Sequence, residues 1–184
     1  MSSAKIPVEG IQIRRALAED APDICSLIDA SIRGIGGRYY DAQEIESSLT
    51  HLFGVDSTMI ADGTYFIATV GPLVVGAGGW SNRMTPFGGD QATDVRNTGL
   101  RDPQKDSAVI RAMYVHPEWA RMKIGQMIIT TCEYAARKAG FTSHELVATL
   151  SGIEFYTKQG YTRQEKVDIL LSDGIIIEAC RMTK

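Results

Sequence analysis

The sequence has few cysteines and histidines, and this scarcity excludes several kinds of site. Its three cysteines, Cys25, Cys132 and Cys180, lie far apart, and no CxxC pair occurs. An odd number at such spacing argues against a disulfide framework and against a zinc site. The three histidines never recur at a metal-ligand spacing, so we expect no metal. Free thiols are typical of a reducing compartment, and we therefore expect a cytoplasmic protein.

Long apolar runs and a strong positive charge are also missing. No stretch approaches the ~20 apolar residues of a membrane-spanning helix. The first ten residues, MSSAKIPVEG, lack the apolar segment of a secretory signal, so we expect no membrane partner. A net charge of -3 is not that of a basic nucleic-acid-binding domain, so nucleic acid is not an expected partner. With 184 residues, 44% of them hydrophobic, the chain is long enough to bury a core without disulfide bonds or a structural metal ion.

Hydrophobic periodicity predicts strands and helices that alternate along the chain. Apolar residues at period two indicate strands, and apolar residues three and four apart indicate helices. Asp20 is expected to be the N-cap of the first helix, and Asp41 begins the second with Glu44 completing a capping box. Strands are expected at 11–17, 64–70, 73–80, 107–116, 143–149, 161–170 and 174–183, and helices from Asp20 to Gly34, from Asp41, at 121–139 and at 151–158.

Residues 82–106 interrupt this pattern. They are rich in Gly, Asp, Asn and Pro and have no periodicity. An irregular segment this long in a compact domain is usually functional or mobile. No repeat or linker divides the chain, so we expect one domain over residues 1–184. The order of elements predicts an α+β or α/β fold with a mixed sheet.

The most informative stretch is the passage from the strand at 107–116 into the helix expected at 121. A strand that leads through a short turn into a helix presents free N–H groups at the positive end of the helix dipole. Arg121 and Lys123 add positive charges at this turn, and Gly125 allows a close approach of ligand or backbone. The sequence therefore predicts a phosphate or pyrophosphate site on an otherwise acidic protein.

Two segments carry a resemblance to a known family. The run from Val115 to Gly125 resembles the acetyl-CoA-binding motif Q/R-x-x-G-x-G/A, preceded by a strand ending V-x-P, of the GCN5-related N-acetyltransferase (GNAT) superfamily. Residues 152–161, GIEFYTKQGY, resemble that family's F-Y-x-x-x-G-Y/F box, at the expected separation of one helix and one strand. The chain departs from the motif at Lys123, where the family usually has its first glycine, and at Ala120, where it has Gln or Arg.

The resemblance covers nearly the whole chain and implies a fold and an activity. The implied fold is a GNAT-like α+β fold, with a mixed, largely antiparallel central sheet of about seven strands flanked by about four helices. The implied activity is acetyl-CoA-dependent N-acetyl transfer to a primary amine, which attacks the thioester directly in a ternary complex. Tyr156 would be the catalytic general acid for the departing thiolate. The implied cofactor-binding residues are Met113, Tyr114, Val115, Arg121, Met122, Lys123, Ile124, Gly125, Gln126 and Thr149.

The acceptor is not identified by the sequence. Small-molecule amines, peptide N-termini, lysine side chains and aminoacyl-tRNA are all candidates, and a homodimer is compatible with the resemblance. A Glu that is common on the strand at 107–116 is absent, and Arg111 occupies that neighbourhood. An alternative function is therefore a non-catalytic acyl-CoA-binding sensor or partner module. We expect residues 82–106 to border the acceptor site, with the loop at 33–40 opposite, and Tyr114 and Arg111 are candidates for its lining.

Several other residues have simpler interpretations. His116 is expected to be a turn residue. Phe155, Tyr161 and Cys132 are expected to be core residues, because nothing nearby in the sequence would activate the Cys132 thiol.

Overall fold

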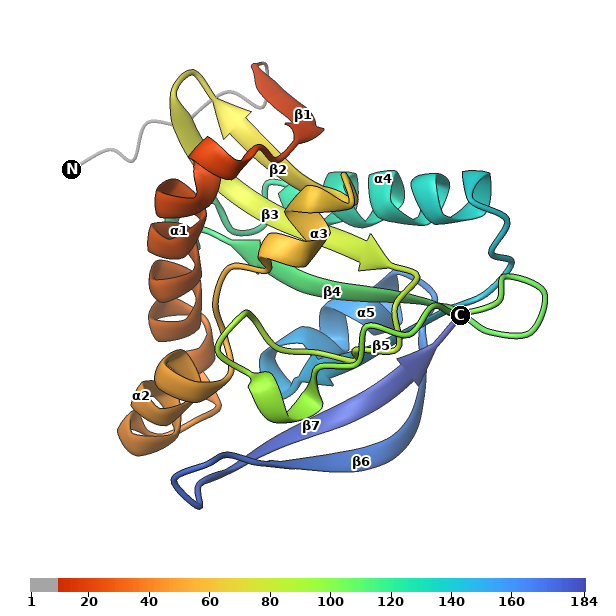
Figure 1. The fold of residues 1–184 in the computed structure, drawn as a ribbon. Helices are drawn as coiled ribbons and strands as arrows, with labels where there is room; N and C mark the ends of the chain where they lie inside the picture. Colours follow the sequence, from red (N-terminus) through yellow and green to blue (C-terminus); the bar gives the residue numbers. More distant parts are fainter. Residues whose placement is uncertain (1–9) are drawn as a thin grey trace.

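Seven strands form one mixed sheet in the computed structural model, which describes residues 10–184 (Figure 1). The strand order is β1-β2-β3-β4-β5-β7-β6, and every neighbouring pair is antiparallel except β4 and β5. This confirms the expected mixed, largely antiparallel sheet. The strands are β1 Ile11–Arg15, β2 Tyr65–Val70, β3 Leu73–Ser81, β4 Ala108–Val115, β5 His144–Thr149, β6 Thr162–Leu170 and β7 Ile176–Thr183.

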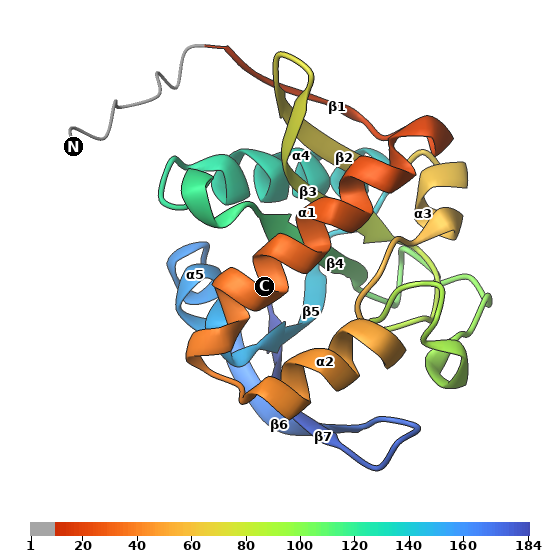
Figure 2. The ribbon, with the colours of Figure 1, turned by 90° about the vertical axis from the view of Figure 1, so that its left-hand side faces the viewer.

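Helices cover both faces of the sheet. They are α1 Ala21–Gly34, α2 Ala42–His51, α3 Ser57–Ala61, α4 Ile124–Lys138 and α5 Ile153–Lys158. Alternate residues of β2 belong to two separate cores: Tyr65 and Ile67 join the cluster that contains the apolar side of α1, and Phe66 and Ala68 join the cluster that contains α4. The two helices therefore lie on opposite faces, and Figure 2 shows α1 crossing the near face of the sheet.

The structure corrects one expected cap and one expected helix start. Asp20 occupies the N-cap position of α1, as expected, but its side chain makes no capping hydrogen bond to that helix. Its carboxylate instead accepts from the Leu17 N–H and pairs with Arg14 at 2.6 Å, beside the 3-10 turn that precedes α1. Helix α4 begins at Ile124, three residues later than expected, because Arg121 and Lys123 have φ angles of 65° and 63°. These left-handed conformations cannot continue a right-handed helix.

One helix was not expected from the sequence. Helix α3 has five residues, too few for a periodic pattern to show, and it depends on its N-cap. The buried Asp56 carboxylate accepts from the Met59 N–H at 3.0 Å.

A bulge and a split in the sheet create the space for a site. Strands β4 and β5 pair only at Ala108–His144 and Val109–Glu145. Beyond this point, β4 carries an extra residue relative to β3, and Ala112 has a φ of 54°. The Tyr65 hydroxyl donates to the Ala112 carbonyl at 3.2 Å and so stabilises the bulge. The bulge and the short pairing leave a gap between the two parallel strands.

Candidate active site

A cavity of about 220 Å³ lies where β4 and β5 separate. One wall is β4 from Ile110 to Val115, and the other is formed by β5 and by residues 151–156. The lining draws on both hydrophobic cores: Ile32 and Phe53 belong to the α1 side of the sheet, and Phe155 and Tyr156 belong to the α4 side. The cavity therefore passes through the sheet, with lining residues from both of its faces.

Five of the expected cofactor-binding residues line this cavity: Met113, Tyr114, Val115, Gly125 and Thr149. The backbone at the end of β4 is oriented by the ladder with β3, since the next N–H along the chain donates to a β3 carbonyl at 3.0 Å. Backbone groups alternate in direction along a strand. The main-chain N–H and C=O of Val115 therefore point away from β3, on the side of the gap.

The other five expected residues are Arg121, Met122, Lys123, Ile124 and Gln126, and none of them lines the cavity. They lie at the start of α4. The first hydrogen bond of this helix runs from the Met127 N–H to the Lys123 carbonyl at 2.9 Å, so the N–H groups of residues 124–126 precede it. The Ile124 side chain is buried in the core, whereas Arg121, Lys123 and Gln126 are exposed. The helix end thus combines free N–H donors with two exposed cations.

Tyr156 lies at the α5 end of the cavity. Its ring packs edge-on against Phe155 and Tyr161, with centroids 5.1 and 5.9 Å away. Within residues 10–184 its hydroxyl makes no hydrogen bond. Burial raises the pKa of Tyr156 well above its usual value, and the neighbouring Tyr114 raises it further. The hydroxyl is therefore held in its protonated form beside the gap.

Phe155 packs against the core, as expected, but is not enclosed by it, and the expectations for three other residues are confirmed. Phe155 is half-buried and lines the cavity; a Cβ atom on Gly125 would lie only 3.2 Å from its ring, so the glycine allows this contact. Tyr161 and Cys132 are core residues, at 2% and 0% exposure. His116 is a turn residue, whose Nδ1 accepts from the Glu118 N–H.

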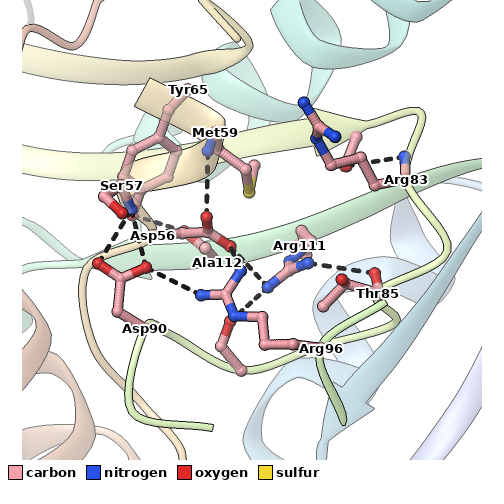
Figure 3. A network of polar contacts seen from close by, with 12 residues as sticks. Asp56, Ser57, Met59, Tyr65, Arg83, Thr85, Asp90, Arg96, Arg111 and Ala112 are labelled. Carbon is pink, nitrogen blue, oxygen red and sulfur yellow. Dashed lines mark hydrogen bonds and ion pairs between the residues drawn. The ribbon is translucent and has the colours of Figure 1, made fainter. Parts of the chain in front are cut away.

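Arg111 lines the cavity, but its charge is already paired. Figure 3 shows its guanidinium against the Asp56 carboxylate, at 2.7 Å, and donating to the Thr85 carbonyl at 3.1 Å. It also donates to the Gly88 carbonyl. Both ionic side chains are almost fully buried, at 3% and 1% exposure, and burial lowers the pKa of Arg111. This pair anchors the irregular segment to β4.

Asp56 was not expected at this site. Its one local signal is the D-S-T sequence at the start of α3, which is typical of an N-cap and does not indicate a contact with Arg111, 55 positions away. Asp56 also pairs with Arg96 at 3.3 Å, and Arg96 pairs with Asp90 at 2.9 Å (Figure 3). The ion pairs of Arg96 and the hydrogen bonds donated by Arg111 therefore attach segment 82–106 to the rest of the protein.

The two loops that were expected to face each other both reach the cavity. Pro86, Phe87 and Gly88 come from segment 82–106, and Ile35 and Gly36 come from the loop after α1.

No group of three or more His, Cys, Asp or Glu side chains between residues 10 and 184 is arranged to hold a metal ion. Over the same range, none of the helices combines the length and the apolar character needed to cross a membrane.

Comparison with known proteins gives a family match and several structural matches. The family model described as "Acetyltransferase (GNAT) domain" matches residues 61–163, more than half of the chain. The sequence matches no curated protein. A GCN5-related N-acetyltransferase from Rhodopseudomonas palustris is 22% identical with a TM-score of 0.70, over 98% of this chain and 99% of that one.

Two further solved structures are similar over most of both chains. The PaiA N-acetyltransferase from Thermoplasma acidophilum, in complex with coenzyme A, is 16% identical with a TM-score of 0.64, over 95% of this chain and 98% of that one. The ribosomal-protein-S18-alanine N-acetyltransferase from Escherichia coli is 13% identical with a TM-score of 0.57, over 94% and 92%. At these identities the likeness shows a shared fold.

Proposed function

Because this chain belongs to the acetyltransferase (GNAT) family, we propose that it transfers the acetyl group of acetyl-CoA to the nitrogen of a primary amine. The observation that carries the proposal is the cavity that passes through the sheet where β4 and β5 separate. The lining within residues 10–184 includes no cysteine or histidine, and its two serines have no adjacent base. An activated nucleophile needs such a base. This favours direct attack by the amine within a ternary complex.

The residues around the gap fit acetyl-CoA. The N–H groups of Ile124, Gly125 and Gln126 would bind the pyrophosphate, helped by the charges of Arg121 and Lys123, with Met122 completing the turn. The main-chain groups of Met113 and Val115 would bind the pantetheine arm in the manner of an added strand. Tyr114 and Thr149 would flank the thioester, because each lines the cavity from one side of the gap.

Acetyl-CoA, when bound, supplies an activated thioester. The protein positions the thioester and the amine and protonates the departing sulfur. The amine nitrogen attacks the carbonyl carbon, so that a C–N bond forms, and the C–S bond then breaks. A gap-facing N–H of β4 would stabilise the oxyanion between these steps. Tyr156 would donate its proton to the departing sulfur, and water would accept the proton released by the nitrogen. Burial raises the pKa of Tyr156 and so keeps its phenol protonated, which means that a proton is in place when the thiolate forms.

A binding experiment tests the anion site at the start of α4. Acetyl-CoA should bind one to one in calorimetry, and acetyl-pantetheine should bind at least ~100-fold more weakly, because two or more charge-assisted hydrogen bonds are lost. Dephospho-CoA, which keeps the pyrophosphate, is the control and should stay close to CoA. Equal affinity for acetyl-CoA and acetyl-pantetheine would contradict the assignment. Tight binding without CoA release for any amine would favour the sensor function instead.

The Lys123→Gly variant separates the backbone strain at Lys123 from the contribution of its charge to acetyl-CoA binding. Lys123 has a left-handed backbone, which costs a residue with a Cβ about 1 kcal/mol more than glycine. The variant should therefore be more stable to urea by about that amount. It should also bind acetyl-CoA about five-fold more weakly, because one charge contact with phosphate is lost. Lys123→Arg is the control that keeps the charge. Unchanged affinity in Lys123→Gly would show that the side chain makes no phosphate contact.

A further inference from the structure

We propose that the acceptor is a small monoamine with an apolar, arylalkyl type of body, rather than a polyamine, an amino sugar or an amine that carries a carboxylate. This inference rests on the proposed function and names its substrate class. It follows from the side of the cavity that faces α1, α2 and segment 82–106, where no cofactor-binding residue lies.

This acceptor wall is apolar. Within residues 10–184, no Asp, Glu or His side chain lines any part of the cavity. A second ammonium group would lose its water on entry and find no carboxylate partner, which is costly. The wall consists of Ser31, Ile32, Ile35, Gly36, Phe53, Pro86, Phe87 and Gly88.

The one charged side chain in the lining is already paired with a carboxylate of the protein. The Arg111 guanidinium is satisfied by Asp56 and by the carbonyls of Thr85 and Gly88 (Figure 3). Its Nε is shielded from solvent and has no partner within residues 10–184. The Asp56 carboxylate therefore neutralises the charge that Arg111 brings to the cavity. An acceptor carboxylate that displaced Asp56 from Arg111 would leave a buried charge unpaired.

Two phenylalanines give the wall its shape. Phe53 packs edge-on against Tyr114, with ring centroids 6.4 Å apart, beside β4. Phe87 lies between Pro86 and Gly88, and the Gly88 carbonyl is bound by Arg111. The buried ion pair thus anchors the backbone next to Phe87. Flat apolar bodies bind well against such rings, because burial of their surface and edge-to-face contacts both contribute.

A matched set of amines tests the inference by CoA release. 2-Phenylethylamine should exceed both 1,4-diaminobutane and phenylalanine by at least ~100-fold in kcat/KM, since each competitor adds one charge that the cavity cannot pair. The Phe87→Asp variant should lower kcat/KM for 2-phenylethylamine and raise it for the diamine. Phe87→Leu should keep the order of the wild type. Melting temperature and acetyl-CoA affinity show that each variant remains folded and loaded.

The results separate this inference from the proposed function. CoA release that is faster with the diamine or with phenylalanine would overturn the acceptor class while supporting acetyl transfer. If no amine releases CoA, calorimetry on the CoA-loaded protein decides: 2-phenylethylamine should still bind more tightly than the diamine. Equal or weaker binding of 2-phenylethylamine would overturn the inference, whereas tighter binding would support it and count against catalysis.

Discussion

Replacing Arg111 by methionine should lower the free energy of unfolding by about 3–5 kcal/mol, the usual cost of leaving a buried charge without its partner. The Asp56 carboxylate, at 1% exposure, would keep only the partly exposed Arg96 as a counter-ion. The carbonyls of Thr85 and Gly88 would also lose their donor. Urea denaturation measures the loss directly.

An exposed ion pair in the same region provides the matched control. Arg83 pairs with Asp62 at 2.7 Å, but both side chains are about one-quarter exposed. Arg83→Met should therefore cost less than about 1 kcal/mol. Adding Asp56→Asn to Arg111→Met should recover at least about 1 kcal/mol, because it removes the orphaned charge and keeps an acceptor for the α3 N-cap. Equal losses from Arg111→Met and Arg83→Met would contradict the importance of the buried pair.

The Tyr156→Phe variant should reduce kcat by about 10²-fold, at the lower end of the range for general acid catalysis, because a thiolate is already a fair leaving group. The ring and its contacts with Phe155 and Tyr161 remain. The hydroxyl makes no hydrogen bond within residues 10–184, so the melting temperature should hold. Affinity for acetyl-CoA should also change little, since the proton is transferred only as the C–S bond breaks.

Tyr161→Phe separates a catalytic hydroxyl from a structural one. The Tyr161 hydroxyl donates to the buried Glu133 carboxylate at 3.0 Å, away from the cavity lining. Its removal should lower stability by about 1 kcal/mol and leave kcat unchanged. Wild-type turnover in Tyr156→Phe would make Tyr156 a packing residue. A reduced kcat at unchanged melting temperature and affinity would support its role as the acid.

Local patterns in the sequence determined most of the secondary structure. The Asp41–Glu44 capping box forms as expected, with both bonds at 2.8 Å, because all its atoms lie within one helical turn. The hairpin of β2 and β3 and the passage from β4 through a turn into α4 follow from periodicity and from short-range turns in the same way. The family motifs also occupy contiguous segments, so the sequence alone was sufficient to indicate the fold and the class of reaction.

Contacts between distant segments were decided only by the tertiary structure. Nothing near Asp20 or Asp56 in the sequence distinguishes a helix cap from the partner of an arginine, because both uses need the same carboxylate. The pairing of Asp56 with Arg111 depends on α3 and segment 82–106 packing beside β4. Likewise Phe155 lines the cavity as well as packing against the core, because β4 and β5 separate after two paired positions. Periodicity reports which residues are apolar, but burial and charge pairing depend on which surfaces meet, and that is a property of the assembled sheet and its helices.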